Sequence, residues 1–160
     1  PVQVYHFVTN WFFDAPIEQV WNEIVDAQSW PHWWPSYRKV TPLTPGSTLQ
    51  VGSRAASEVR GKLPYSLRFI VEVTELEAPR LLALNSSGAL VGKGRFVLEE
   101  RDGGTALTYY WDVGTSNPLL NLLARLPFFR AMIEDNHDYI MDEGYAGLKQ
   151  RLGTKAESLA

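Results

Sequence analysis

The segment RLPFFRAMIEDNHDYIMDEGYAGLKQRL, residues 125–152, decides the fold of this chain. After Pro127 it contains no proline, and apolar or small residues recur at the spacing of one helical face. This face comprises Met132, Ile133, His137, Ile140, Met141, Gly144, Leu148 and Leu152. The spacing predicts one amphipathic helix of roughly 23 residues and about 35 Å, which is long enough to cross a small domain.

Two glycines, Gly144 and Gly147, lie on or beside this apolar face. Glycine inside a helix costs about 0.5–1 kcal/mol relative to alanine, so its presence indicates that another surface passes close to the helix. We therefore expect the helix to press directly on a sheet.

Asn136 and His137 place polar groups where a core would favour leucine. A buried polar group needs a hydrogen-bond partner, which can be protein, water or ligand. Two interpretations follow. His137 is either a core histidine bonded within the protein or a polar group that faces a cavity.

Composition limits the class of protein. A chain of 160 residues with 45% hydrophobic content is typical of one globular domain with a sizeable core. We assign residues 1–152 to a single domain and the polar residues 153–160 to a frayed tail. The net charge is −3 and the basic residues are scattered, which argues against a nucleic-acid partner.

The chain contains no cysteine, which excludes disulfides, a thiolate nucleophile and a thiolate metal site. This composition suits a cytoplasmic protein. The most apolar stretch, residues 118–129, is too short and too interrupted to span a bilayer, so we expect no stable membrane insertion.

The first 35 residues predict a strand followed by two short helices. VYHFVTNWFF, residues 4–13, is rich in aromatic and β-branched residues. One face of this strand carries Tyr5, Phe7, Thr9, Trp11 and Phe13. The second helix ends in a cluster of Trp30, Trp33 and Trp34 next to His32. This cluster either plugs the junction of helices and sheet, forms a ligand-binding lip, or packs against another chain.

From Pro35 to about residue 115 the hydrophobic pattern has a period of two, with short turns between segments. The pattern predicts an antiparallel meander. Ala55 and Ser57 on one inner face, and Gly92 and Gly94 on another, are small enough to leave space for a cavity.

The apolar connection PLLNLLARLPFF, residues 118–129, precedes the long helix. Apolar connections are rarely left in water. The segment is therefore either a short buried helix or a lid that packs over a ligand.

Five segments, together with this order of elements, carry a family resemblance: APIEQVWNEIVDAQSWPHWWP (15–35), GKLPYSLRFIVEV (61–73), GALVGKGRFVL (88–98), GTALTYYWDV (104–113) and NHDYIMDEGYAGL (136–148). The chain resembles the SRPBCC superfamily of START-like proteins, which includes polyketide cyclases and dehydrases, plant allergen-type carriers and lipid-transfer domains. The resemblance implies an α+β helix-grip fold. In this fold a curved antiparallel sheet of about seven strands wraps the long C-terminal helix, with two short helices after the first strand.

The resemblance also implies a cavity between sheet and helix, but not what happens in it, because one fold hosts many functions. His6, His32 and His137 lack metal-ligand spacing, and phosphate-loop, dinucleotide and nucleophile-elbow motifs are missing. We expect no metal and no cofactor.

The first functional hypothesis is binding or carriage of a hydrophobic or aromatic small molecule, lipid-like or polyketide-like, by a monomer or homodimer. The predicted ligand-binding residues are Ser57, Tyr65, Leu67, Phe69, Phe96, Tyr109, Trp111, Asn136, His137 and Met141. Aromatic and aliphatic side chains would supply the walls, and His137 with Asn136 would hold the polar end of the ligand.

The alternative is a polyketide cyclase or dehydratase in which His137 exchanges protons. Asn136 or the hydroxyl of Tyr65 or Tyr109 would hold an enolate-like oxygen, and Asp112 would take part if its strand turned inward. A third possibility is a protein-interaction domain whose tryptophan cluster packs against another chain.

Overall fold

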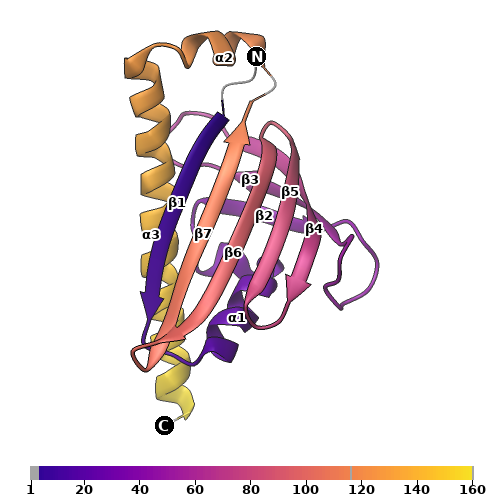
Figure 1. Cartoon of the computed structure of the whole chain (residues 1–160), viewed down its shortest axis with the longest axis vertical. Coiled ribbons are helices and arrows are strands. Elements are labelled where there is room, and N and C mark those ends of the chain that lie inside the picture. Colours follow the sequence, from indigo (N-terminus) through magenta and orange to yellow (C-terminus); the bar gives the residue numbers. More distant parts are fainter. Residues whose placement is uncertain (1–3, 116, 160) are drawn as a thin grey trace.

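A curved sheet, three short helices and one long helix make up the fold of this computed structural model, which describes residues 4–115 and 117–159 (Figure 1). In chain order the elements are β1 (Val4–Phe13), α1 (Ile17–Val25), the 3₁₀ helix η1 (Ala27–His32), β2 (Tyr37–Pro42), β3 (Arg54–Val59), β4 (Leu67–Glu77), β5 (Leu81–Gly88), β6 (Val91–Arg101), β7 (Gly104–Gly114), α2 (Pro118–Leu123) and α3 (Pro127–Leu159).

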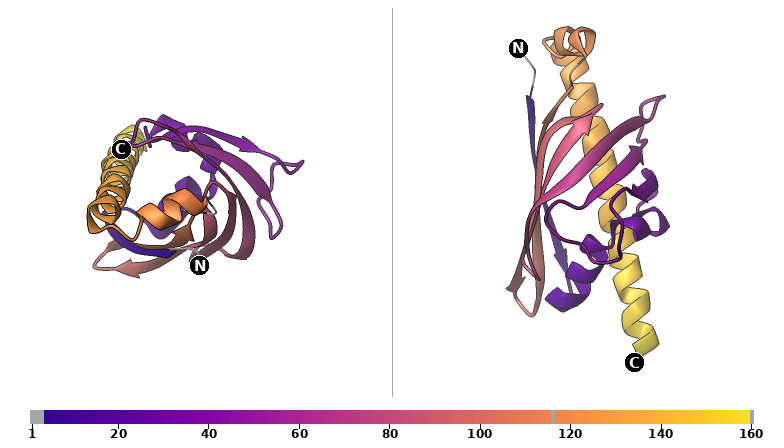
Figure 2. Two further views of the ribbon diagram at one scale, coloured as in Figure 1. Left: turned by 90° about the horizontal axis from the view of Figure 1, so that it is seen from above. Right: turned by 90° about the vertical axis from the view of Figure 1, so that its right-hand side faces the viewer.

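The sheet has seven strands in the order β1-β7-β6-β5-β4-β3-β2, and every neighbouring pair is antiparallel. Strands β2 to β7 follow one another as a meander, and β1 returns beside β7. The register shifts between Tyr37 and Lys39 and between Val73 and Glu75, and such irregularities bend a sheet. The predicted α+β helix-grip fold is confirmed: the sheet is curved, and α3 lies along its open, concave side (Figure 2).

Strand β1 has the predicted alternation. Tyr5, Trp11 and Phe13 are buried, whereas Val8 on the other face is 59% exposed. Strand β1 pairs with β7, and its inner face points toward α3. Residues far apart in sequence therefore share one interior.

The tryptophan cluster plugs the junction between helices and sheet. Trp30, Trp33 and Trp34 are each 5% exposed or less. The Trp34 indole N–H donates a hydrogen bond to the Ile140 carbonyl of α3 at 2.8 Å. The hypothesis that this cluster packs against another chain is wrong, because its rings are already buried within this one.

Gly144 and Gly147 of α3 meet this cluster and not the sheet. A Cβ at Gly144 would lie 2.5 Å from the Trp34 indole, and one at Gly147 would overlap the Trp33 carbonyl oxygen. The prediction that a surface lies close to these glycines is confirmed, but that surface is Trp33 and Trp34 and not the sheet. The polypeptide that follows η1 is inserted between the helix and the sheet.

Helix α3 continues beyond the predicted end at Leu152 to Leu159, through residues that the sequence assigned to a polar tail; residue 160 lies outside the described residues. The helix extends because its last turns are bound to α1, and the hydrophobic spacing of the sequence does not reveal this contact. Buried Glu23 of α1 accepts hydrogen bonds from Arg151 at 2.5 Å and from Lys155. These ion pairs attach the last turns of α3 to α1.

Helix α2 lies across one end of the space between α3 and the sheet (Figure 2). None of its residues is buried, so the interpretation as a buried helix is wrong. In the described part of the chain, no helix combines the length and apolarity needed to cross a membrane.

Candidate functional site

Two hollows lie beneath the concave face of the sheet. The first, here called the helix cavity, has a volume of about 300 Å³ and is enclosed by the sheet, α2 and α3. The second, the loop cavity, has a volume of about 250 Å³ and lies under the β2–β3 loop and the α1–η1 junction. The side chains common to both walls are Tyr37, Phe69, Tyr109 and Trp111.

Most of the predicted ligand-binding residues come together around the helix cavity. The predicted residues that line it are Tyr65, Leu67, Phe69, Tyr109, Trp111, Asn136, His137 and Met141. They come from β4, β7, α3 and the β3–β4 loop, so the predicted cavity between sheet and C-terminal helix exists.

Two predicted residues lie elsewhere. Phe96 is fully buried behind Tyr109, with the two rings stacked at 4.0 Å between centroids, so it supports the wall without lining the helix cavity. Ser57 lines the loop cavity instead, because β3 passes both hollows: Val59 at its end lines the helix cavity, whereas Ser57 lies farther back along the strand. Both residues do face the interior, as the strand alternation predicted.

The space predicted at Gly94 is occupied by an aromatic ring. A Cβ at Gly94 would lie 2.7 Å from the Trp111 ring, which occupies the room that the missing side chain leaves. Trp111 is directly opposite Gly94 in the β6–β7 register. Glycine therefore allows a tryptophan to form part of the cavity wall at this position.

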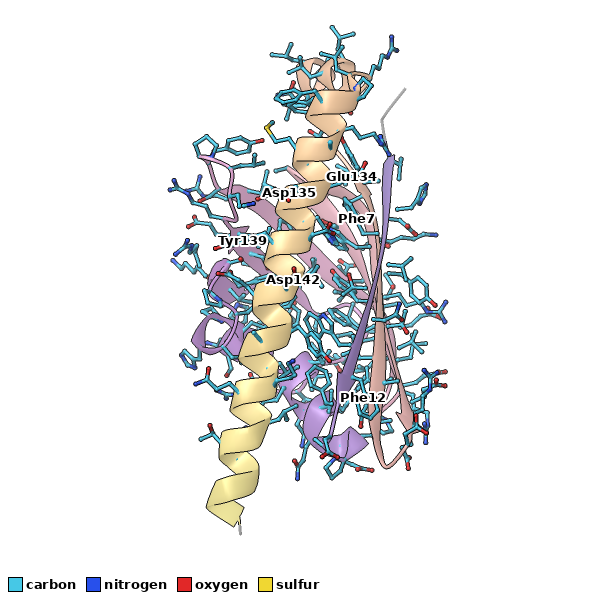
Figure 3. The ribbon with its side chains drawn as sticks, turned by 90° about the vertical axis from the view of Figure 1, so that its left-hand side faces the viewer. Phe7, Phe12, Glu134, Asp135, Tyr139 and Asp142 are labelled. Atoms are coloured by element: carbon cyan, nitrogen blue, oxygen red, sulfur yellow. The ribbon has the colours of Figure 1, made fainter. Side chains whose placement is uncertain are left out.

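Two polar side chains in the helix cavity have no hydrogen-bond partner among the described residues. The Tyr5 hydroxyl and both ring nitrogens of His137 are buried without a hydrogen bond. The His137 ring stacks on Phe7 at 3.7 Å between centroids, and Figure 3 shows Phe7 of β1 beside α3. Buried polar groups are nearly always hydrogen-bonded, so these exceptions indicate a place for a ligand or water.

The imidazole of His137 is neutral at pH 7. Burial lowers its pKa from 6.5 to about 4, and the nearby carboxylate of Asp138 opposes this effect only in part. The Asp138 oxygen lies 3.8 Å from Nδ1, which is too far for a strong hydrogen bond. A neutral imidazole can donate one hydrogen bond and accept another.

Tyrosine hydroxyls also remain protonated in this interior. Burial raises the pKa of Tyr5, and the guanidinium of Arg130, 4.4 Å from its ring centre, opposes the shift. Burial likewise raises the pKa values of Tyr37 and Tyr109, which lie between the two hollows. All three hydroxyls are therefore available as hydrogen-bond donors.

Asn136 has a structural role that the sequence did not reveal. Its side-chain oxygen accepts a hydrogen bond from the Lys62 backbone N–H at 2.7 Å. A Cβ at Gly61 would overlap the same oxygen, so the β3–β4 loop closes tightly on α3. Asn136 lines the cavity, but its carbonyl is already used to hold the wall together.

Asp112 points away from the interior. Its carboxylate lies 2.9 Å from the His6 ring on the outer face of the sheet, and this excludes it from the cavity. Among the described residues, no group of three or more His, Asp or Glu side chains is arranged to hold a metal ion.

The sequence missed Tyr5 and Phe7 as site residues, although it placed both on the inner face of the first strand. It also missed Leu120 and Phe129, which line the cavity from α2 and the start of α3. The interpretation of residues 118–129 as a lid could have identified Leu120 and Phe129 from the sequence. The structure favours that interpretation, since these two side chains close one end of the cavity.

Residues 6–153 match the family described as polyketide cyclase/dehydrase and lipid transport. The chain belongs to this family. It is thus a member of the SRPBCC superfamily that the sequence motifs resemble. No curated protein matches it.

Solved structures share the family's fold at low sequence identity. The aromatase/cyclase Zhui from Streptomyces sp. R1128 has 16% identity and a TM-score of 0.75 over 96% of each chain. TTHA0849 from Thermus thermophilus has 14% identity and a TM-score of 0.77 over 94% of this chain and 99% of that one. Ms6760 from Mycobacterium smegmatis has 20% identity and a TM-score of 0.66 over 97% and 99%.

At these identities the structural likeness establishes the fold alone. Membership of the polyketide cyclase/dehydrase and lipid-transport family supports a ligand-binding or cyclase role.

Proposed function

We propose that this protein binds and carries an apolar or aromatic small molecule with one uncharged polar end in the helix cavity. The observation that carries the proposal is the presence of unpaired hydrogen-bonding groups, on Tyr5 and His137, in an otherwise apolar hollow. A pocket of this kind, with few polar groups in an apolar wall, is typical of a small-molecule site.

The charge of the ligand follows from the lining. No Asp, Glu, Lys or Arg side chain is among the described residues that line the helix cavity, and His137 is neutral. Burying an ionised carboxylate without a counter-charge is very costly, and the nearby guanidinium of Arg130 is already paired with Glu134 at 3.5 Å. The polar end is therefore a hydroxyl or a carbonyl, and a neutral sterol-like or polyketide-like molecule fits better than an ionised fatty acid.

Binding of three naphthalene probes tests this proposal. Calorimetry or fluorescence should give 1-naphthol an affinity about ten-fold higher than naphthalene, since one net hydrogen bond contributes about 1–1.5 kcal/mol. Ionised 1-naphthoate should bind most weakly. Tyr5→Phe removes one hydroxyl and should reduce the preference for 1-naphthol, whereas Tyr139→Phe on the exposed face of α3 should leave it unchanged.

Equal affinities of the wild type for naphthalene and 1-naphthol would contradict the assignment of the polar end. No binding of any probe, with native mass spectrometry also finding no co-purified small molecule, would contradict the carrier function itself.

A second candidate is a cyclase or dehydratase, favoured by the placement of a neutral imidazole and protonated tyrosines around one cavity. His137 could accept a proton from an enolisable ketone while the Tyr5 hydroxyl stabilises the developing oxyanion. A base with a pKa of about 4 is weak, which favours carriage over catalysis.

Turnover of a synthetic poly-β-ketone would test this candidate. If His137 is the base, kcat/KM should be constant from pH 8 down to about pH 5. It should fall below about pH 4, where the imidazole becomes protonated. His137→Gln should remove this fall in kcat/KM at low pH. Equal turnover by this variant and the wild type would eliminate His137 as the catalytic residue.

A further inference from the structure

The segment that covers the helix cavity also exposes apolar side chains to solvent. Leu119 and Leu122 of α2, with Leu126 and Phe128 just after it, are 62%, 58%, 54% and 80% exposed. We call these four residues the apolar tip. Figure 2 shows α2 projecting beyond the strands at one end of the molecule.

The apolar tip is continuous with the helix cavity. Leu120 and Phe129, between and beside the exposed residues, line the cavity from the inside. Val4 and Val91, at 40% and 43% exposure, flank Gly114 at the same end of the sheet, and Gly114 is itself part of the cavity wall. One short segment thus separates the interior from an exposed apolar surface.

The charge around the tip is positive in a chain that is negative overall. Residues 113–133 contain no Asp or Glu, and their two cations are Arg125 and Arg130. Arg130 is paired with Glu134 of α3 at 3.5 Å, so Arg125 supplies the uncompensated positive charge at the tip. Arg125 is exposed and has no ion-pair partner in the described part of the chain. Exposed apolar side chains beside arginine favour the surface of an anionic lipid bilayer.

We propose that the apolar tip docks on the surface of a lipid bilayer, with the covered end of the helix cavity facing the lipid. A second protein copy fits less well, because a stable interface uses roughly 20–30 residues on each side, far more than this tip presents. Passage of a ligand through the tip rests on the proposed function, whereas the docking does not.

Cosedimentation with lipid vesicles tests the docking. The wild type should sediment with vesicles of phosphatidylcholine and phosphatidylglycerol in equal parts. It should bind pure phosphatidylcholine about five-fold more weakly, because one exposed arginine near an anionic surface contributes about this factor. Arg125→Gln should reduce binding to the mixed vesicles by a similar factor and leave binding to pure phosphatidylcholine unchanged.

Phe128→Glu should lower the partition into mixed vesicles by about ten-fold or more, since an exposed ring that enters the lipid on docking is replaced by a charge. Val51→Glu is the matched control: Val51 is 62% exposed in the β2–β3 loop, away from the tip, and its variant should bind like the wild type. Both side chains project into solvent, so both variants should fold, which urea unfolding would verify.

Absence of wild-type binding to mixed vesicles, or equal losses for Phe128→Glu and Val51→Glu, would overturn the proposal. Self-association that Phe128→Glu abolishes, without vesicle binding, would instead assign the tip to a second copy. Binding of 1-naphthol separates the two proposals. Vesicle binding leaves the docking intact even where no naphthalene probe binds and no small molecule co-purifies, a result that removes only the carrier function. Naphthol binding without vesicle binding removes only the docking.

Discussion

Replacing Gly147 by alanine will destabilise the protein by about 3 kcal/mol. The new Cβ would overlap the Trp33 carbonyl oxygen, a backbone atom that cannot rotate away. Either α3 or the segment after η1 must shift, and this shift would disturb the buried rings of Trp33 and Trp34. Urea unfolding followed by tryptophan fluorescence would measure the loss as a lower midpoint with an unchanged slope.

The same substitution at Gly153 gives the opposite sign and is the matched control. A Cβ at Gly153 meets nothing within 4 Å, and the residue lies in the same helix. Gly153→Ala should therefore stabilise the protein by about 0.5–1 kcal/mol, the helix preference of alanine over glycine. A Gly147→Ala variant as stable as the wild type would show that the contact between α3 and Trp33 is looser than described.

The second large effect is a loss of stability in mild acid that depends on His137. Its pKa is about 4 in the folded protein and 6.5 when exposed, so between these values the unfolded chain binds more protons. The contribution of the neutral imidazole is fully present above about pH 6.5. It is lost as the pH falls toward 4, and the total change is about 2–3 kcal/mol.

His137→Phe keeps a flat ring against Phe7 but cannot be protonated. Urea unfolding at pH 7 and pH 4 should show a fall in stability that is about 2–3 kcal/mol larger for the wild type than for this variant. Other acid-sensitive groups affect both proteins and cancel in the comparison. Parallel losses in the two proteins would mean that His137 is hydrated or hydrogen-bonded in the folded state.

The fold was predictable because each element carries a local signature. The period of two in β1, with Tyr5, Trp11 and Phe13 on one face, and the helical spacing of α3 are properties of neighbouring residues. The order of elements then selected the helix-grip arrangement. The end of α3 was missed because its cause, the pairing of Glu23 with Arg151, joins residues 128 positions apart.

The candidate site was predictable only as a set of inward-facing residues. Strand alternation shows that Ser57 and Phe96 face the interior, but it does not show which hollow they reach or which ring covers them. Similarly, Asn136 was recognised as a buried polar group, yet its partner, the Lys62 N–H, belongs to a distant loop. Partners across a cavity depend on sheet curvature, which single-sequence periodicity does not encode.

Gly94 never touches the helix cavity, yet it determines how far Trp111 projects into it. Any larger residue at this position would force the indole inward. A residue that lies behind the cavity wall therefore controls the width of the cavity. Relatives with identical lining residues could therefore differ in the width of the ligand that they accept. A comparison restricted to the cavity-lining positions would overlook the residue responsible.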